Sequence, residues 1–540
     1  MSSHANELYV HTPIFTAAGR PWAEAMVVSD GRIRYVGDEP TARRIAGDDA
    51  VEVDAGGGVI LPGFVDGHAH VVSTGELEGH ADLWSAHDLA EIQSRVKTWA
   101  TDHPDAARVR AQGWQHAALH GVEPSRELLD AVVADRPVYV QAFDLHSIWV
   151  NSAALTELGI DDGTPDPVGG KIARDPATGV ATGLIDETAM QEYVWPFLEA
   201  RQSDADRDRD LDTALDGYRR HGVTAAVDMA LGEQDLAAFA RREEAGTLTA
   251  RLVGHWLVHR AEDPEENLAQ VRRAAELARR HTSPWLRVTG IKIIVDGTVD
   301  GCTATLGRPY SNGELPGPIW DLDALAPVVA AADAAGLQVA MHAIGDEAIR
   351  IAIAAVENAV RVNPPRLRRH RIEHLEVVEE AEIARLAALG LTASMQPVHA
   401  DPAIQENWRT MLGDERIERG FPWPEMTAAG APLVFGTDSP TSPYAPLPNM
   451  FVAATRRSAL NPTLPANVAH YALPLAEAVT HATRDAAWAC RADESYGQLA
   501  PGLLADFVVV DRDIFTVAVD ELLEARIVRT VVGGRTVWTA

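Results

Sequence analysis

Two histidines separated by one residue follow an apolar run near the beginning of the chain. The run covers residues 59–65, and His68 and His70 come soon after it. Residues i and i+2 of a β-strand point to the same face, so a strand over 64–70 would present both imidazoles together. Paired imidazoles are good ligands for transition metals. The motif therefore predicts a buried strand that ends in a metal site, although a His-x-His pair on a solvated loop would look the same.

Three further candidate ligands each end a short apolar or β-branched run later in the chain. They are His342, His374 and Asp438, and each is followed by a helical pattern or by a proline-rich turn. A (β/α)8 barrel presents its active site in this way, with ligands at the C-terminal ends of successive parallel strands. The order of the runs therefore predicts a barrel with all these ligands at one end.

Lys292 lies inside the apolar run 288–295, where an unpaired ammonium group is costly to bury. The chain has 47 basic residues, of which only Lys97, Lys171 and Lys292 are lysines. Arginine cannot lose its proton in a protein, whereas a desolvated lysine can become a neutral amine. Such an amine can add carbon dioxide and form a carbamate that bridges two metal ions. A buried ion pair of Lys292 with Asp296 or Asp438 is the alternative interpretation.

Several shorter motifs follow one another in a fixed order across nearly the whole chain. They are Gly113-Trp114 and the segments 144–152, 222–224, 292–297, 394–397 and 497–506. Together with the candidate ligands they resemble the amidohydrolase superfamily of metal-dependent hydrolases, most closely the branch that contains the N-substituted formamide deformylases (amidohydrolase family 3 type). The chain departs from that branch at Leu145, where glycine is usual, and at Leu503-Leu504, which replace a lysine-containing turn.

The resemblance implies a role for each candidate ligand. His68, His70 and Asp438 would bind a first metal ion, His342 and His374 would bind a second, and carboxylated Lys292 would bridge the two. Zinc suits this donor set, with iron, manganese and nickel as other candidates, whereas so many histidines disfavour magnesium and calcium. We therefore expect two divalent metal ions as cofactors, with zinc as the first choice.

The two ends of the chain differ from its middle in their pattern of apolar residues. Short β-rich runs separated by turn residues occupy residues 7–60 and 506–538. Between them, helical patterns alternate with the strand candidates, at 265–280, 322–335, 347–362, 377–389 and 475–490. We expect an α/β fold with a (β/α)8 TIM-like barrel over 61–494. The resemblance adds a small β-sandwich domain built from residues 1–60 and 495–540.

The segment between His70 and the second barrel strand, near 223–229, is too long for a βα loop. We expect residues 75–219 to form an insertion with its own structure, which lies over the catalytic face as a lid. Its Trp114 and His146 are candidate substrate contacts. A packing role for the tryptophan and a satisfied core position for the histidine are equally open.

Trp320, Arg308 and Trp423 fall in loops that should also reach the catalytic face, and Gln396 ends the strand expected over 391–395. Trp320 and Gln396 are further candidate substrate contacts, although Gln396 could merely cap its strand. Glu373, next to His374, would point to the opposite face of a regular strand and is expected to be structural.

The composition disfavours several classes of binding partner and of structural site. The net charge of −31 disfavours binding to nucleic acid and to anionic membranes. Cys302 and Cys490 are the only cysteines, which excludes a disulfide framework and a cysteine metal cluster. No apolar run approaches the roughly 18 residues of a membrane span, and the start of the chain does not read as a signal peptide. We expect a cytoplasmic protein with a small-molecule substrate, and a homodimer is among the assemblies that the sequence allows.

The ligands and the resemblance predict hydrolysis of a non-peptide C–N bond, in an amide, an N-substituted formamide or a cyclic amide. A metal-bridging hydroxide would attack, Asp438 would pass its proton to the leaving amine, and Lys292 would be the second catalytic residue. The candidate tryptophans favour a neutral or cationic substrate with an apolar group on the amide nitrogen. The alternative functions are a mononuclear deaminase of a heterocycle and an esterase or lactonase. A catalytically inactive scaffold protein is a remote alternative.

Overall fold

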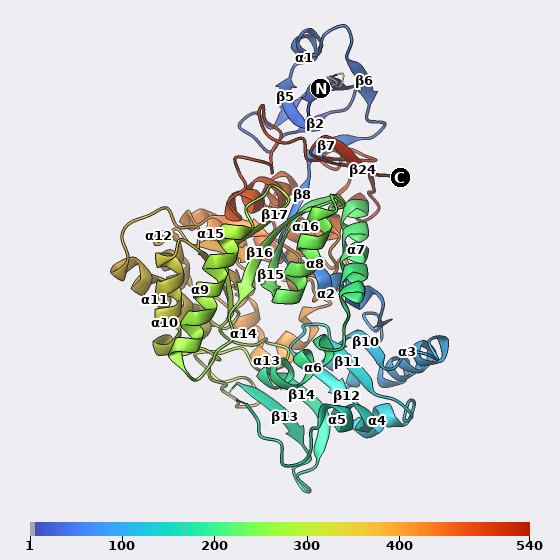
Figure 1. Cartoon of the computed structure of the whole chain (residues 1–540), viewed down its shortest axis with the longest axis vertical. Helices are drawn as coiled ribbons and strands as arrows, with labels where there is room; N and C mark the ends of the chain where they lie inside the picture. Colours follow the sequence, from blue (N-terminus) through green and yellow to red (C-terminus); the bar gives the residue numbers. More distant parts are fainter. Residues whose placement is uncertain (1–5, 168) are drawn as a thin grey trace.

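Eight parallel strands form the central sheet of the molecule (Figure 1). The computed structural model describes residues 6–167 and 169–540. The strands follow one another in chain order around the sheet: β8 (Phe64–Ala69), β15 (Val223–Leu231), β16 (Arg251–Leu257), β17 (Leu286–Ile294), β18 (Gln338–Ala343), β19 (Arg371–His374), β20 (Thr392–Met395) and β21 (Leu433–Phe435).

The first and last of these strands meet and close the sheet. The N–H of Asp438 donates to the carbonyl of His68 at 2.7 Å, and the N–H of His70 donates to the carbonyl of Ser439 at 2.8 Å. Two glycines allow this approach, because a Cβ on Gly67 would lie 2.6 Å from the carbonyl oxygen of Phe435 and one on Gly436 would lie 2.4 Å from the backbone nitrogen of His68. The predicted TIM-like barrel is confirmed.

Helices follow the strands and cover the outside of the barrel, as the change of period predicts. Helix α11 shows why they pack there, since Ile349, Ile353 and Val356 form one buried stripe at helical spacing. The helices along this part of the chain are α8 (Glu233–Glu244), α9 (Pro264–Arg280), α10 (Leu322–Ala334), α11 (Asp346–Val362), α12 (Glu380–Ala388), α13 (Trp408–Leu412), α14 (Asp414–Ile417), α15 (Trp423–Ala429), α16 (Pro446–Thr455), α17 (Leu475–Thr480) and α18 (Ala486–Ala489). Helices α13 and α14 lie toward the insertion rather than outside the barrel (Figure 1), and α18 packs with side chains of several barrel strands. Within the described ranges, no helix has the length and apolar character needed to cross a membrane.

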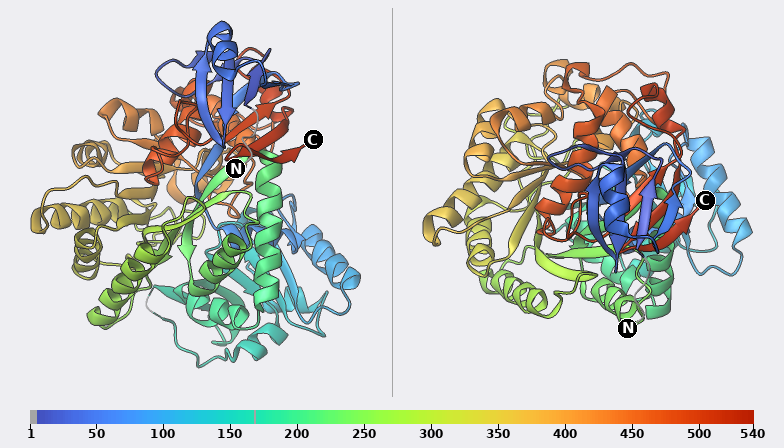
Figure 2. Two further views of the ribbon diagram at one scale, coloured as in Figure 1. Left: turned by 45° about the horizontal axis from the view of Figure 1, so that its top comes forward. Right: turned by 90° about the horizontal axis from the view of Figure 1, so that it is seen from above.

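Strands from both ends of the chain pair beside the barrel, where Figure 2 shows them in blue and red. One sheet has the order β24 (Arg535–Thr539), β23 (Ile527–Val532), β22 (Phe507–Val510), β7 (Val59–Pro62), β2 (Ile14–Phe15) and β3 (Trp22–Ala23). The other has the order β5 (Arg32–Gly37), β4 (Ala25–Ser29), β1 (Glu7–Val10) and β6 (Val51–Asp54), with helix α1 (Glu39–Ala46) against it. Tyr9 and Phe507, one from each sheet, lie edge to face at 5.0 Å in a shared core. The domain boundaries near 60 and 495 stay a prediction.

A separate sheet is inserted between β8 and β15, and it lies at the end of the barrel away from the terminal strands (Figure 1). Its order is β13 (Gly170–Arg174), β14 (Ala181–Glu187), β12 (Ser147–Val150), β11 (Val138–Ala142), β10 (Val109–Trp114) and β9 (Ala81–Asp82). The insertion also holds α3 (Leu89–Asp102), α4 (Arg126–Asp130), α5 (Ser152–Leu158) and α6 (Trp195–Glu199). Helices α2 (Val71–Glu78) and α7 (Asp204–His221) flank this sheet in sequence and pack against each other, and α7 also contacts β15.

Candidate metal centre

The C-terminal ends of five barrel strands bring the predicted ligands together. The parallel register places Ile294 of β17 beside His342 of β18, and Ala343 of β18 beside His374 of β19. Neighbouring strands therefore end at similar levels. The side chains that meet there are His68 and His70 at the end of β8, Lys292 on β17, His342 on β18, His374 on β19 and Asp438 after β21.

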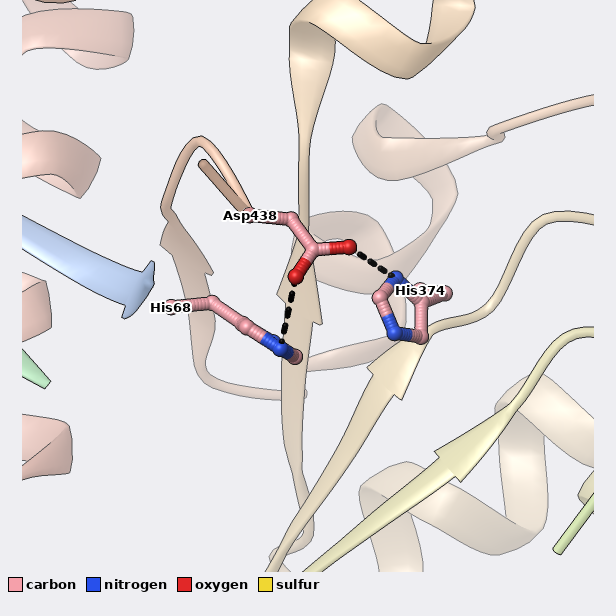
Figure 3. A group of neighbouring side chains, drawn as sticks. All are labelled: His68, His374 and Asp438. Atoms are coloured by element: carbon pink, nitrogen blue, oxygen red, sulfur yellow. Dashed lines mark ion pairs between the residues drawn. The ribbon is translucent and has the colours of Figure 1, made fainter. Parts of the chain in front are cut away.

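The carboxylate of Asp438 lies in the middle of this group (Figure 3). Its Oδ1 is 3.0 Å from Nε2 of His68 and 3.1 Å from Nε2 of His70, and its Oδ2 is 3.9 Å from Nδ1 of His374. Burial alone would raise the pKa of Asp438, but the nearby histidines, His68 first, outweigh burial and hold that pKa well below its usual range. Asp438 is therefore an ionised carboxylate that faces imidazole nitrogens.

His68 is oriented by a buried carboxylate behind it. Its Nδ1 lies 2.8 Å from Oε2 of Glu373, and the guanidinium of Arg371 donates to both oxygens of Glu373 at 2.6 and 3.0 Å. This contact leaves Nε2 of His68 to face Asp438 and Nζ of Lys292, the latter at 3.1 Å. A carboxylate on one imidazole nitrogen is the usual arrangement behind a metal-binding histidine.

The contact with Glu373 corrects one expectation from the sequence. Regular strand alternation turns Glu373 away from the site that His374 serves. In the structure, His374 and Leu375 have φ values of 76° and 52°, so the backbone leaves extended geometry at His374. Both side chains consequently reach the site, Glu373 from the strand and His374 from the bend that ends it. Left-handed backbone in a non-glycine residue is uncommon and clusters at functional sites.

Lys292 is buried, with 2% of its surface exposed. Burial lowers the pKa of its ammonium group to about 8, although Glu373 and Asp438 oppose this shift. No ion pair within 4.0 Å joins Lys292 to Asp296 or Asp438, all three of which are described residues. Asp296 instead accepts hydrogen bonds from the backbone N–H groups of Thr305, Ile344 and Gly345. The geometry therefore disfavours the interpretation of Lys292 as the cation of a buried ion pair with Asp296 or Asp438.

The two remaining histidines are each held through one ring nitrogen. Nδ1 of His374 lies 2.8 Å from Oε1 of Gln396, and Nε2 of His342 lies 3.2 Å from the carbonyl oxygen of Gly297. Their rings are 4.5 Å apart, and burial lowers the pKa of both well below the usual value. Each is a neutral imidazole with its other nitrogen left for a ligand.

This donor set fits a divalent transition metal. Ligand atoms of His68, His374 and Asp438 all lie within 4.8 Å of one another. Two imidazoles and an ionised carboxylate gathered this closely are the donor types that such an ion requires. Contacts with Glu373 and Gln396 hold the two imidazoles in place.

A second group beside the centre was absent from the sequence-based site. Ligand atoms of His374, Glu376 and His399 also lie within 4.8 Å of one another. Nδ1 of His399 is 3.2 Å from Oε1 of Glu376, and its Nε2 is 3.1 Å from Oγ1 of Thr441 and 3.7 Å from Oδ2 of Asp438. The available signal was the position of His399, three residues after Gln396.

A cavity of about 610 Å³ opens from the candidate centre toward the insertion, and His146 lines it. Nδ1 of His146 lies 2.8 Å from Oε2 of Glu187, and its ring is 5.3 Å from that of His342. Burial lowers the pKa of His146, but the carboxylate of Glu187 outweighs burial and raises that pKa to about 9. The structure thus brings His146 to the cavity, beside Leu145 at φ 61°.

The structure does not bring Trp114, Trp320 and Gln396, which were expected to contact the substrate, to the wall of this cavity. Trp114 is fully buried in the insertion and donates Nε1–H to the carbonyl of Val140 at 3.1 Å. Trp320 is buried in the core outside the barrel sheet, and Gln396 holds His374. Trp423 is also fully buried, and it and Arg308 lie outside the wall too. The large apolar area of tryptophan favours packing, and the sequence gives no signal that separates a core tryptophan from one in a cavity wall.

Comparison with known proteins identifies the family. A model described as the amidohydrolase family matches residues 51–538. The chain belongs to the amidohydrolase family. Among amidohydrolase relatives, YtcJ of Bacillus subtilis (strain 168), named as an amidohydrolase, is 29% identical over 535 residues, which cover 95% of this chain and 96% of that protein. The N-substituted formamide deformylase of Arthrobacter pascens is 28% identical over 535 residues, which cover 95% and 94%.

Solved structures give the same answer. A metal-dependent hydrolase from Pyrococcus horikoshii ot3 matches this amidohydrolase with a TM-score of 0.75 at 25% identity, over 95% of this chain and 99% of that one. A Xaa-Pro dipeptidase matches at 14% identity with a TM-score of 0.52, which shows a shared fold alone. The resemblance found in the sequence is confirmed. The protein is a hydrolase of the amidohydrolase family, and membership of this family of metal-dependent enzymes implies that it uses a divalent metal.

Proposed function

We propose that this amidohydrolase hydrolyses a non-peptide C–N bond in a small molecule, as an amide, an N-substituted formamide or a cyclic amide, with two metal ions. One observation carries the proposal. Lys292 is buried beside Nε2 of His68 at 3.1 Å, among four histidines and Asp438, without a carboxylate within ion-pair distance in the described residues. A buried amine in this position has a histidine beside it but no carboxylate at ion-pair distance among the described residues to neutralise its charge.

In this proposal Lys292 is carboxylated. Its neutral amine forms an N–C bond with carbon dioxide and releases a proton, which gives a carbamate anion. His68, His70 and Asp438 would hold a first ion, His342 and His374 would hold a second, and carboxylated Lys292 would be a ligand of both. Zinc is the preferred metal because imidazoles and carboxylates dominate the donor set.

Metal ions bound there supply two effects, a lower pKa for a coordinated water and polarisation of the carbonyl under attack. Asp438 accepts the proton of the attacking water and passes it to the nitrogen of the leaving amine. Its low pKa and its contacts with His68 and His70 keep the carboxylate ionised and oriented for the first step. His146, on the cavity wall, contacts the substrate beside the carbonyl group.

A substrate screen with purified protein tests the proposal. We expect hydrolysis of at least one amide, formamide or lactam, with activity that a chelator removes and a divalent metal restores. A release of ammonia from heterocycles with one bound ion would favour a deaminase, and a preference for esters or lactones would favour an esterase. Protein with no bound metal and no hydrolysis of any substrate would support the scaffold alternative. We keep the expected cytoplasmic location and a possible homodimer as part of the proposal.

A further inference from the structure

The cavity has an inner part at the candidate ligands and an outer part whose wall combines large apolar side chains with charged and polar ones. The outer part lies between the insertion and the ends of two barrel strands, β15 and β16. On the insertion side, a π-helical turn over Met190–Val194 leads into α6, and the wall residues Gln191, Trp195 and Leu198 are spaced four and three apart. This spacing turns one face of the segment toward the cavity.

Large apolar side chains face one another across the outer part. Trp195 and Leu198 come from the insertion, and Trp256 and Leu257 come from the end of β16. Trp195, Trp256 and Leu257 stay partly exposed, although comparable side chains elsewhere in the core are covered. Apolar surface left open inside a cavity of about 610 Å³ gains free energy when an apolar ligand group covers it.

The charged side chains around the outer part disfavour an anion. Three arginines line it, and each already has a carboxylate partner: Arg110 with Glu76 at 3.1 Å, Arg207 with Asp235 at 3.3 Å and Arg273 with Glu233 at 2.6 Å. The carboxylate of Glu199 also lines the cavity; burial raises its pKa, and the nearby Arg207 opposes this shift. A negatively charged substrate would meet these carboxylates and, among the described wall residues, no guanidinium without a carboxylate partner.

We infer that the outer part of the cavity binds an apolar substituent on the nitrogen of the scissile amide, uncharged or cationic at its far end. Trp195 and Leu198 of the insertion and Trp256 and Leu257 of the barrel grip this group, while the carbonyl carbon lies at the ligand cluster. The inference rests on the proposed function. It assigns substrate selection to the insertion and names the residues that perform it.

Three formamides test this assignment on the purified, metal-containing enzyme. They carry a methyl group, a 3-phenylpropyl group, or a phenylpropyl group with a carboxylate on its ring. We expect kcat/KM to be at least about tenfold higher for phenylpropyl than for methyl, because burial of several methylene groups outweighs the cost of ordering them. We expect the carboxylate to reverse most of that gain.

Two variants locate the effect. Trp195→Ala and Leu257→Ala, one on each wall, should each lower kcat/KM for the phenylpropyl substrate by at least about tenfold more than they lower kcat/KM for the methyl substrate. Trp99→Ala is the matched control, since Trp99 lies on α3 of the same insertion, stacks on His103 at 4.1 Å and does not line the cavity. Equal losses for both substrates in the wall variants, or the same selective loss in Trp99→Ala, would overturn the assignment.

A binding measurement separates this inference from the proposed function. Titration calorimetry with 3-phenylpropylamine should detect binding to the wild-type enzyme and at least about tenfold weaker binding to Trp195→Ala. If no formamide, amide or lactam is hydrolysed but the amine binds in this way, the proposed function fails and the apolar site stands. If formamides are hydrolysed without preference for the long substituent and the amine binds both proteins equally, the site assignment fails and the proposed function stands.

Discussion

Both ends of the barrel bury charged side chains. The two ends differ in how many hydrogen-bond and ion-pair partners those side chains have. At the N-terminal end of β16, Arg251 and Asp506 form a two-pronged pair at 2.6 and 2.9 Å. Arg251 also donates to the carbonyl of Pro284 at 3.0 Å, and Asp506 accepts from the N–H of Gly533 at 2.6 Å. Each nitrogen of the guanidinium therefore donates a hydrogen bond, and each oxygen of the carboxylate accepts one. This ion pair joins the terminal sheet to the barrel.

At the C-terminal ends, Lys292 and Asp438 are buried with fewer partners. Oδ1 of Asp438 contacts Nε2 of His68 and of His70, its Oδ2 has no partner closer than 3.7 Å among the described ion pairs, and the buried amine has only an imidazole nitrogen at hydrogen-bond distance among the described residues. Buried polar groups normally have their hydrogen bonds satisfied. The contrast teaches that burial of charge alone does not mark a functional site, whereas buried charge with incomplete partners does.

The largest expected effect comes from Lys292→Arg. This substitution places an arginine at the C-terminal end of the barrel, as Arg251 is at the other end. The guanidinium keeps the charge but cannot add carbon dioxide, so we expect kcat/KM to fall at least about a thousandfold. Lys292→Ala should regain part of its activity when a short carboxylic acid such as propionate is added. Near-wild-type kcat/KM in Lys292→Arg would mean that Lys292 is a structural cation, as Arg251 is.

Asp438→Asn should lower kcat by at least about a hundredfold, because the amide offers an oxygen ligand but cannot accept a proton. Steady-state kinetics and metal analysis on the same sample measure the two properties separately. We expect much of the metal to remain bound. Retained turnover with full metal content would move the general-base role to another residue.

Glu373→Gln tests whether the carboxylate that contacts His68 supports metal binding. The amide keeps the shape of the contact with His68 but loses the negative charge, so metal affinity should fall about 10- to 100-fold. Competition with a chelator measures this affinity. The control is Glu425→Gln, since Glu425 pairs with Arg419 away from the cavity. Equal affinity in Glu373→Gln and wild type would show that His68 is not held for a metal.

Arg251→Met should have the smallest effect on catalysis and a large effect on stability. It leaves the carboxylate of Asp506 buried without its guanidinium, which costs about 3–5 kcal/mol. We expect a lower midpoint of urea denaturation and a kcat within about twofold of wild type for the folded protein. A large loss of kcat at unchanged stability would break the distinction between the two ends.

The barrel and the gathering of the candidate ligands at one of its ends could be predicted from the sequence because their signals are local. The apolar runs before His68, His342 and His374 have the length of strands, and the helices between them have period 3.6. Parallel strands then bring ligands that are far apart in the chain to one end of the barrel. Lys292 was visible because a lysine in an apolar run is exceptional in a chain with so few lysines.

The cavity wall could not be predicted, because it depends on packing between distant segments. Trp114 and Trp195 lie in the same insertion, yet Trp114 is fully buried and Trp195 faces the cavity. Their local sequence patterns do not separate these two outcomes. The shared direction of Glu373 and His374 was hidden for another reason, since the left-handed backbone of His374 breaks the alternation on which the prediction relied. The contact of Glu373 with His68 agrees with the expected structural role.

Metal analysis of the purified wild-type enzyme beside Lys292→Arg tests the central claim most directly. The claim is that the incomplete set of partners at the C-terminal ends of the strands is a two-metal centre bridged by carboxylated Lys292. We predict about two equivalents of divalent metal per chain in the wild type, with zinc preferred, and at most about one in the variant. Active wild-type protein that carries no bound metal, or two equivalents retained in Lys292→Arg, would contradict the claim.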